Sequence, residues 1–435
     1  MSNQLIDSKI QWVGKIPTDW STIKIKWLTS IKRGASPRPI DDPKFFDDNG
    51  QYAWVRIADV SKSGMYLNET PQKMSNIGSL LSVKREPGDI FISIAGTVGK
   101  PCITSIKCCI HDGFVYFPDF KGEVRYLYYI FDSGEPYKGL GKMGTQLNLN
   151  TETVGSIEIP NIPRSLQMKI SDYLDVKTEK INKLIAIKEN LIKLLEEKRQ
   201  AMITEAVTKG LNPNVKMKDS GVEWIGEIPE HWISSLLKRF CVNITDGSHF
   251  SPEIQDEGYP YVTVKDIQDD RVNIAEALRI SEQDFFELTK NGCKPLKGDI
   301  LLSKDGTIGK VAIVDKEECV VLSSLAIIKP TELVNSQYLA YWFKSKVNFE
   351  QMNSFLAGAA LRRLTIQTIN KFKLVLPPVI EQLEIAKYLD CNLVEIIESL
   401  SLTKNQIQKL KEYRQSLIYE AVTGKIDVRD FEIEQ

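Results

Sequence analysis

Two long stretches of the chain repeat apolar residues at alternating intervals of three and four. In the first, the spaced positions are Ser171, Leu174, Thr178, Ile181, Ile185, Lys188, Ile192, Leu195, Arg199, Met202 and Ala206, of which seven are apolar. In the second, 215 residues further on, they are Ala386, Leu389, Leu393, Ile396, Leu400, Thr403, Ile407, Leu410, Arg414, Leu417 and Ala421, of which nine are apolar. This spacing predicts two long helices, each with one apolar seam.

Each stretch follows a proline, Pro163 or Pro378, and stops at a glycine, Gly210 or Gly424, with neither residue type inside. Each therefore reads as one helix of about 44 residues, about 65 Å long. A Leu or Ile side chain left exposed loses about 1.5–3 kcal/mol of stabilisation relative to a buried one. Each apolar seam is therefore expected to pack against another surface. We expect them to cover each other as an intramolecular coiled coil; the alternative is two helices that pack separately on their own domains. The predicted interface residues are Leu174, Ile181, Ile185, Ile192, Leu195, Met202, Leu389, Leu393, Ile396, Leu400, Ile407, Leu410 and Leu417.

The helices end a larger internal repeat. Residues 7–20, DSKIQWVGKIPTDW, match 219–232, DSGVEWIGEIPEHW, and residues 88–100, GDIFISIAGTVGK, match 298–310, GDILLSKDGTIGK. Residues 7–218 therefore form one half and 219–435 the other.

About 130 residues of mixed character precede each helix, and we predict a compact α+β domain there. The β-rich runs are 52–58, 89–95, 113–118, 299–303, 325–329 and 371–376, and a short aromatic helix is expected near 124–132 and near 336–345. A domain of this size has a radius of gyration of about 14 Å and cannot return the chain along a helix of about 65 Å.

The predicted fold class is therefore α+β, with two mixed α/β domains at opposite ends of a long antiparallel two-helix coiled coil and a pseudo-twofold axis across its middle. The expected boundaries are 1–164 for the first domain, 165–209 for the first helix, 210–379 for the linker and second domain, and 380–435 for the second helix and tail.

Composition excludes some classes of protein. No run of 18 apolar residues exists and the first ten residues are not a basic-then-apolar signal, so we expect a cytoplasmic protein. The seven cysteines form no C-x-x-C pair, which favours reduced thiols, and the three histidines have no zinc-ligand spacing.

Catalytic motifs are also missing from the sequence. No G-x-S-x-G, H-E-x-x-H or G-x-G-x-x-G occurs, and no Asn/Asp-Pro-Pro-aromatic tetrapeptide of an amino-methyltransferase. The repeated G-T-[VI]-G-K at 96–100 and 306–310 lacks the spacing of a phosphate-binding loop, so we interpret it as a tight turn between strands. The alternative keeps its lysine, Lys100 or Lys310, as a contact to a backbone phosphate of DNA. We predict no catalytic residue and no metal site.

The twin W-x-G-x-I-P-x-x-W blocks, the twin helices ending E-A-V-T at 205–208 and 420–423, and the variable segments between them resemble the specificity subunit of type I restriction–modification enzymes. The resemblance covers essentially the whole chain. It implies two target-recognition domains, each reading one half of a split DNA site, and a helical spacer on which two methyltransferase subunits and restriction–translocase subunits assemble. Catalysis would then reside in those partners, with S-adenosylmethionine, ATP and Mg as their cofactors, and none in this chain. Because the two domains differ outside the scaffold, the two half-sites should differ as well.

A net charge of −1 means that any contact with DNA phosphates is local or shared with a partner. Base recognition uses exposed polar and charged side chains on loops. The loop after residue 31 and its counterpart after residue 244 are the best candidates, followed by the loops at 144–148 and 358–363. The predicted DNA-binding residues are Lys32, Arg33, Ser36, Arg38, Arg56, Lys100, Thr145, Gln146, Asn148, Thr245, Asp246, Ser248, His249, Lys265, Lys304, Lys310, Arg362 and Arg363. Any one of them could instead be an ordinary solvated loop residue, and His249 alone is better read as part of a turn.

Four tryptophans of the repeated blocks, Trp12, Trp20, Trp224 and Trp232, are predicted to seat each domain on the helices. Arg199 and Arg414 occupy equivalent seam positions, where they are either solvated or fix the register of the two helices; we favour register.

Two other functions compete with DNA recognition. A duplicated coiled-coil scaffold that binds only proteins would have the same helices, and exchanging residues 20–150 between family members would then leave the methylated sequence unchanged. A nuclease or methyltransferase acting alone would need activity in the purified chain.

Overall fold

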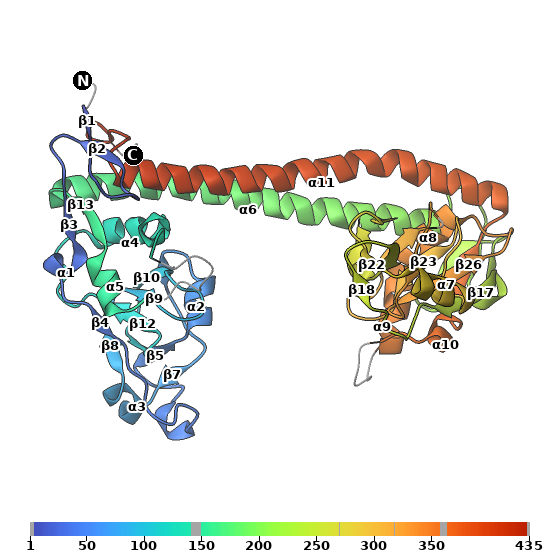
Figure 1. Cartoon of the computed structure of the whole chain (residues 1–435), viewed down its shortest axis with the longest axis horizontal. Helices are drawn as coiled ribbons and strands as arrows, with labels where there is room; N and C mark the ends of the chain where they lie inside the picture. The colour runs from blue at the N-terminus through green and yellow to red at the C-terminus, as the bar shows by residue number, and fades with distance from the viewer. Residues whose placement is uncertain (1–3, 141–148, 269, 317, 357–362, 433–435) are drawn as a thin grey trace. The chain divides into compact units, whose positions relative to one another are not determined.

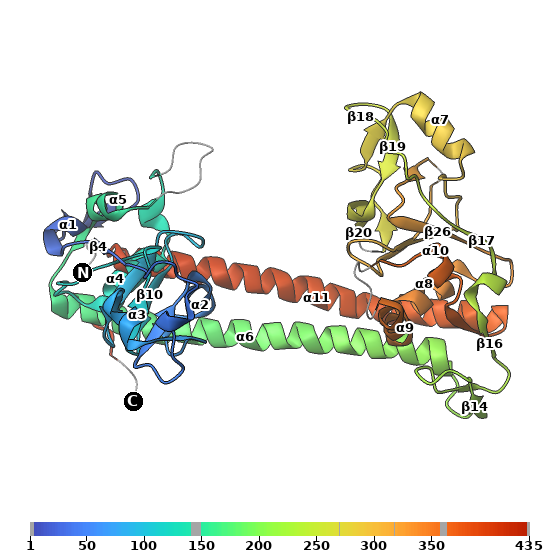
Figure 2. The same ribbon diagram turned by 90° about the horizontal axis from the view of Figure 1, so that it is seen from below.

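The computed structural model describes residues 4–140, 149–268, 270–316, 318–356 and 363–432. The chain divides into two compact units, Met1–Lys188 with Asn405–Gln435, and Glu189–Lys404. Each unit thus takes one half of each long helix, α6 (Arg164–Lys209) and α11 (Val379–Val422). The two uninterrupted helices predicted from the heptads are confirmed. In both views of the chain, α6 and α11 lie side by side within each unit (Figures 1 and 2).

The first unit is built mainly from short strands that form two sheets and two pairs. Its five-stranded sheet has the order β4-β12-β9-β10-β6, a four-stranded sheet has the order β7-β5-β11-β8, and β1-β2 and β13-β3 are two-stranded pairs. The strands are β1 (Leu5–Asp7), β2 (Lys15–Pro17), β3 (Ser21–Lys24), β4 (Lys32–Arg33), β5 (Tyr52–Val55), β6 (Tyr66–Leu67), β7 (Lys73–Met74), β8 (Val83–Arg85), β9 (Ile90–Ser93), β10 (Pro101–Thr104), β11 (Cys108–Ile110), β12 (Phe114–Tyr116) and β13 (Glu158–Asn161). The helices are α1 (Ile25–Leu28), η1 (Pro43–Phe45), α2 (Ile57–Lys62), α3 (Asn76–Leu80), α4 (Val124–Asp132), η2 (Glu135–Tyr137) and α5 (Thr151–Ser156).

The second unit repeats this plan. Two four-stranded sheets have the orders β17-β26-β23-β24 and β18-β22-β19-β25, and β14-β15, β16-β27 and β20-β21 are pairs. The strands are β14 (Met217–Asp219), β15 (Glu227–Pro229), β16 (Ile233–Leu236), β17 (Cys241–Asp246), β18 (Ile254–Gln255), β19 (Tyr259–Val262), β20 (Ile267–Gln268), β21 (Arg271–Val272), β22 (Leu278–Ile280), β23 (Ile300–Ser303), β24 (Val311–Ile313), β25 (Val320–Val321), β26 (Leu325–Pro330) and β27 (Lys373–Leu376). The helices are η3 (Leu237–Arg239), η4 (Val264–Asp266), α7 (Glu282–Lys290), α8 (Ser336–Lys344), α9 (Lys346–Leu356) and α10 (Ile366–Ile369). The predicted aromatic helices are α4 and α8, and the predicted β-rich runs all contain strands.

Within each unit the two long helices run in opposite directions. In the first, Lys188 Nζ donates to Gln406 Oε1 at 2.7 Å, while Lys169, earlier in α6, donates to the carbonyl of Arg429, beyond the end of α11. In the second, Gly210, just after α6, lies beside Glu381 in the first turn of α11. Higher residue numbers on α6 therefore lie beside lower residue numbers on α11, as in an antiparallel pair.

The predicted seam residues are buried or half-buried between these helices and the domains. Leu174, Leu389, Leu393 and Ile396 are at most 5 % exposed, and Ile181, Ile185, Leu400, Ile407 and Leu417 are also buried. Ile192, Leu195, Met202 and Leu410 are partly covered. A fully buried Leu or Ile contributes about 1.5–3 kcal/mol, which makes the seam a main source of stability for both units.

The same tyrosine contacts fasten each domain to its helices. Tyr126 of α4 donates to the Val422 carbonyl at 3.0 Å, and Tyr338 of α8 donates to the Val207 carbonyl at 3.2 Å. One turn later, Tyr129 donates to an Asp175 carboxylate oxygen and Tyr341 to one of Asp390, each at 2.6 Å. Gln415 and Gln200 add equivalent hydrogen bonds from the long helices to the ends of α4 and α8. The internal repeat is therefore a repeat of contacts as well as of sequence.

The register role favoured for Arg199 and Arg414 is wrong. Arg414 pairs with Asp132 at the end of α4 at 2.8 Å, and Arg199 pairs with Asp270 in the second domain at 3.4 Å. Both arginines point to a domain rather than to the opposite long helix, because each domain places a carboxylate against that position.

Arg414→Ala is expected to lower the free energy of unfolding by about 2–3 kcal/mol, because it strips the main partner from Asp132, whose side chain is only 9 % exposed. Arg199→Ala is the matched control and should cost at most about 1 kcal/mol, since Asp270 is 43 % exposed and keeps Lys344 at 2.8 Å. Urea denaturation of both variants measures the difference. Equal losses of unfolding free energy in the two variants would contradict the stronger stabilising role given to Arg414.

The four block tryptophans are not equivalent. Trp12 and Trp232 are buried, and their indole N–H groups donate to the Glu158 carbonyl at 2.9 Å and to Glu381 Oε2 at 3.0 Å. Trp20 is half-buried beside Gly424. Trp224, however, is 40 % exposed, so its prediction as a scaffold residue is not supported.

Candidate nucleic-acid interface

A glycine without room for a side chain shapes the first candidate loop. The Gly34 amide donates to the Phe114 carbonyl at 2.9 Å, and the Ala35 amide donates to that of Ile110 at 3.1 Å. A Cβ at position 34 would lie 2.1 Å from the carbonyl oxygen of His111. The loop that follows β4 is thereby pressed against the turn between β11 and β12, which brings Ser36 and Arg38 beside His111 and Asp112.

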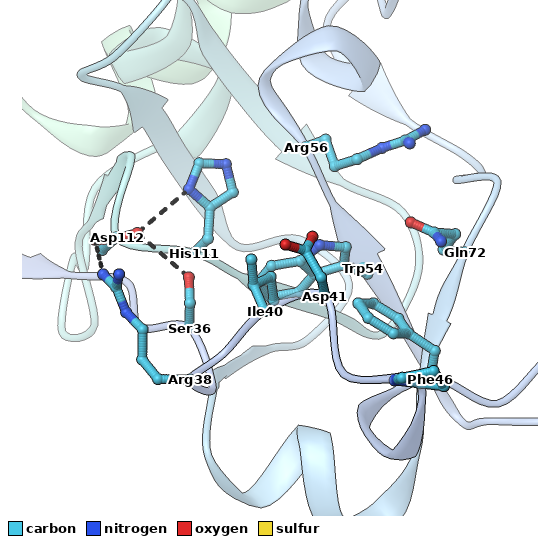
Figure 3. Close-up of a pocket in the computed structure, with 11 residues that line it drawn as sticks. Ser36, Arg38, Ile40, Asp41, Phe46, Trp54, Arg56, Gln72, His111 and Asp112 are labelled. Atoms are coloured by element: carbon cyan, nitrogen blue, oxygen red, sulfur yellow. Dashed lines mark hydrogen bonds and ion pairs between the residues drawn. The ribbon is translucent and has the colours of Figure 1, made fainter.

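Three side chains from β4 and the loop after it converge on Asp112, and Figure 3 shows two of them, Ser36 and Arg38. Its carboxylate accepts from Ser36 Oγ and from Arg38 Nη2, both at 3.3 Å, and its carbonyl accepts from Arg33 Nε. The Arg38 side chain is nevertheless 79 % exposed. The Asp112 carboxylate therefore orients the Arg38 guanidinium, whose remaining N–H groups face solvent.

His111 belongs to this site although no sequence motif marks it. Its ring packs against Trp54 and Phe114, with centroids 5.8 and 4.7 Å away. Burial lowers the pKa of the imidazole, which favours the neutral ring. Nδ1 accepts the Gly113 amide at 2.9 Å, so the neutral ring carries its proton on Nε2 and is a donor there.

Arg56 lies across the hollow from Asp112, next to Gln72 (Figure 3). Both its Nε and Nη2 donate to Asp59 at 3.2 Å, and the side chain is 44 % exposed. The hollow between the two arginines has a volume of about 760 Å³, and Trp54 and Phe46 contribute apolar surface to its lining. Lys32, on β4, is exposed as well.

Gly34→Ala is expected to destabilise the first unit by about 1–3 kcal/mol, because the new Cβ must displace backbone. Gly64→Ala is the control, since a Cβ there meets nothing within 4 Å. Thermal denaturation measures both. If Gly34→Ala has the same melting temperature as the wild type, the loop is not packed closely against the His111 carbonyl.

The second unit repeats this backbone arrangement, which we call the frame: a glycine and the residue after it, both hydrogen-bonded to carbonyls of neighbouring strands. The Gly247 amide donates to the Leu325 carbonyl at 3.1 Å and the Ser248 amide to that of Val321 at 2.8 Å, as Gly34 and Ala35 do in the first unit. A Cβ on Gly247 would lie 2.1 Å from the Val321 carbonyl oxygen. The side chains on the frame differ.

In this second frame, charged groups cluster around a buried lysine. Lys304 is 1 % exposed and pairs with Asp246 at 3.5 Å and Asp305 at 3.3 Å. His249 Nε2 lies 2.9 Å from the same Asp246 oxygen, and Arg363 Nε lies 3.0 Å from Asp305 Oδ1. His249 is 65 % exposed at the side chain.

Several predicted contacts are turned inward instead. Lys304 is buried, Lys310 donates to the carbonyls of Val264 and Ile267, and Lys100 pairs with Asp132. Ser248 is 3 % exposed, and Thr245 Oγ1 is buried. These five side chains are poorly placed to meet a ligand. Lys265 is exposed, while Thr145, Gln146, Asn148 and Arg362 lie outside the described residues.

The two G-T-[VI]-G-K segments are tight turns between β9 and β10 and between β23 and β24. Lys100 N donates to Ser93 Oγ at 3.1 Å and Lys310 N donates to Ser303 Oγ at 2.8 Å. Gly96, Gly99, Gly306 and Gly309 all have positive φ. The lysine amide and the amide of the glycine before it are therefore bonded within each turn and are not offered to a phosphate.

Among the described residues, no three His, Cys, Asp or Glu side chains are grouped to hold a metal ion. Within those same ranges, no helix is both long and apolar enough to cross a membrane. The two units present one frame with different exposed hydrogen-bonding side chains, Arg38 in the first and His249 in the second.

Comparison with known proteins names the family. A model described as the type I restriction modification DNA specificity domain matches residues 17–197 and again 242–412. Since the two matches cover most of the sequence, the chain belongs to this family of non-catalytic DNA specificity subunits.

Relatives of full length agree with this result. The chain is 24 % identical over 434 residues to the type I restriction enzyme MjaVIII specificity subunit of Methanocaldococcus jannaschii, covering 96 % of this chain and 95 % of that one. It is 22 % identical over 443 residues to the EcoBI specificity subunit of Escherichia coli, covering 98 % and 90 %. A solved chain from work titled "Structural basis underlying complex assembly and conformational transition of the type I R-M system" matches with a TM-score of 0.68 and 16 % identity, over 94 % of this chain and 99 % of that one, and this shows a shared fold.

Proposed function

We propose that the chain reads a split, asymmetric sequence in double-stranded DNA, one half-site with each unit. The observation that carries the proposal is the duplicated frame. Gly34 and Gly247 hold the same backbone geometry, while Arg33 and Ser36 in one unit are replaced by Asp246 and His249 in the other. A constant frame with unlike donors and acceptors suits the recognition of unlike base sequences.

The proposed architecture places the two target-recognition domains, 1–164 and 210–379, at opposite ends of an antiparallel coiled coil formed by 165–209 and 380–435. Support comes from the uninterrupted α6 and α11, each of which contributes one half to either unit. The repeated tyrosine and glutamine contacts that fasten each domain to these helices support a pseudo-twofold duplication. Such a rod would fix the distance between half-sites, as dimer geometry does in twofold DNA-binding proteins.

The partners of this assembly would be methyltransferase subunits, two in number, and restriction–translocase subunits, in the cytoplasm. On α6, Leu184, Ile187, Leu191 and Leu194 are spaced by three and four residues and are 42–65 % exposed. An exposed apolar stripe on a helix is the kind of surface that receives another helix. S-adenosylmethionine, ATP and Mg would be bound by those partners.

Exchanging residues 20–150 for the corresponding segment of another family member tests the proposal. The complex with its methyltransferase partner should then methylate a sequence in which one half-site is new and the other is unchanged. Methylated adenines in the host genome report the outcome. An unchanged methylated sequence would favour the alternative, a scaffold that binds proteins only.

A further inference from the structure

The two frames invert their charge at the same structural position. In the first unit, Arg33 pairs in register with Val115 of β12; in the second, Asp246 pairs with Ala326 of β26. Their glycine neighbours make the same hydrogen bonds, so position 33 and position 246 are equivalent. A guanidinium in one unit therefore stands where a carboxylate stands in the other.

The two units also differ in charge just after the next strand, β9 in the first unit and β23 in the second. Ile94 N donates to the Gly113 carbonyl at 2.8 Å, and Lys304 N donates to that of Ser324 at 2.9 Å, so Ile94 and Lys304 are equivalent, as are Ala95 and Asp305. The first unit has apolar residues at these two positions, whereas the second has the buried Lys304 and the carboxylate of Asp305.

The first hollow is lined by donors on Arg38, Arg56 and His111, together with the carboxylates of Asp41 and Asp112 and apolar side chains. Arg38 has one nitrogen on Asp112, and Arg56 has two on Asp59, so each keeps N–H groups that face outward. His111 adds a donor at Nε2, as the Gly113 contact requires. In the major groove, the base that presents two acceptors side by side is guanine, through O6 and N7, and arginine is its commonest partner.

The second frame offers an acceptor instead. The Asp246 side chain is 27 % exposed, and its contacts with His249 and Lys304 both use Oδ2. Oδ1 remains for an amino group, which adenine presents at N6 and cytosine at N4. Buried Lys304 pairs with this carboxylate at 3.5 Å and holds it in place.

We propose, on the basis of the proposed function, that the half-site read by the first unit contains a guanine selected by Arg38, and that the half-site read by the second unit contains an adenine or cytosine selected through its amino group by Asp246. The exposed guanidinium groups of Arg38 and Arg56 in the first unit and the Asp246 carboxylate in the second make the two half-sites chemically opposite.

Selection from a random DNA library by the chain assembled with its methyltransferase partner tests this. Arg38→Ala should lower the preference for guanine at one position of one half-site by about 10- to 100-fold, and Arg38→Lys should restore part of it. Asp246→Asn should widen the preference at one position of the other half-site, because an amide also donates to thymine and guanine oxygens. Lys107→Ala, which removes an exposed cation of the first unit that does not line the hollow, is the control and should leave every base preference unchanged.

If Asp246→Asn fails to fold because Lys304 loses a partner, His249→Ala tests the same carboxylate with both partners of Lys304 in place. It should widen the same position, since His249 orients Asp246. A wild-type split site that lacks guanine in the first half, or equal loss on all sequences with Arg38→Ala, would overturn the inference while the proposed function stands. A wild type that selects no split site would instead refute the proposed function.

Discussion

Inserting three heptads into each long helix is expected to lengthen the preferred gap between the half-sites by about nine base pairs. Twenty-one added residues extend a helix by about 32 Å, and a base pair rises by about 3.4 Å. Nine base pairs are close to one turn of DNA, so both half-sites would again face the protein. The insertions belong between Lys188 and Glu189 and between Lys404 and Asn405, which are nearly level because Lys188 bonds to Gln406.

A single heptad in each helix is the matched comparison. It adds about 10 Å, or about three base pairs, which turns one half-site by about a third of a turn away from its domain. Binding should therefore weaken at every gap length. Selection from a library of DNA with variable gaps measures both variants. An unchanged gap preference in the three-heptad variant would show that the helices do not set the distance.

Trp232→Ala is expected to lower the free energy of unfolding by about 3–5 kcal/mol. Trp232 is 0 % exposed, packs in the core of the second unit, and donates to Glu381 at the start of α11. Its removal leaves a cavity and frees one end of a helix from the domain. Denaturant titration followed by circular dichroism measures the change.

Trp224→Ala is the control from the same sequence block. Trp224 is 40 % exposed, and its removal should cost no more than about 0.5 kcal/mol. Comparable losses from the two substitutions would show that the second unit does not rest on Trp232.

The long helices could be predicted closely because their signal is local and sustained. The first was expected at 165–209 and spans Arg164–Lys209; the second was expected to begin near 380 and begins at Val379. What the pattern could not reveal was the partner of each polar seam position. Arg414 and Arg199 bond to Asp132 and Asp270, which come from distant loops.

The candidate site, too, could be predicted from the sequence only in part. The loop at Gly34 was visible from its glycine and its arginines, but His111 and Asp112 reach it only through strand pairing across about 75 residues. Nothing local distinguishes Asp112 from any other acidic turn residue. Lys304 was predicted to contact DNA because it is a charged residue that follows a strand. It is buried instead, because two carboxylates pair with it.

The most direct test is to let the chain, assembled with its methyltransferase partner, select from fully random double-stranded DNA. We expect two unlike half-sites separated by a fixed number of unspecified base pairs. A palindromic or continuous site, or enrichment without any sequence in common, would contradict it.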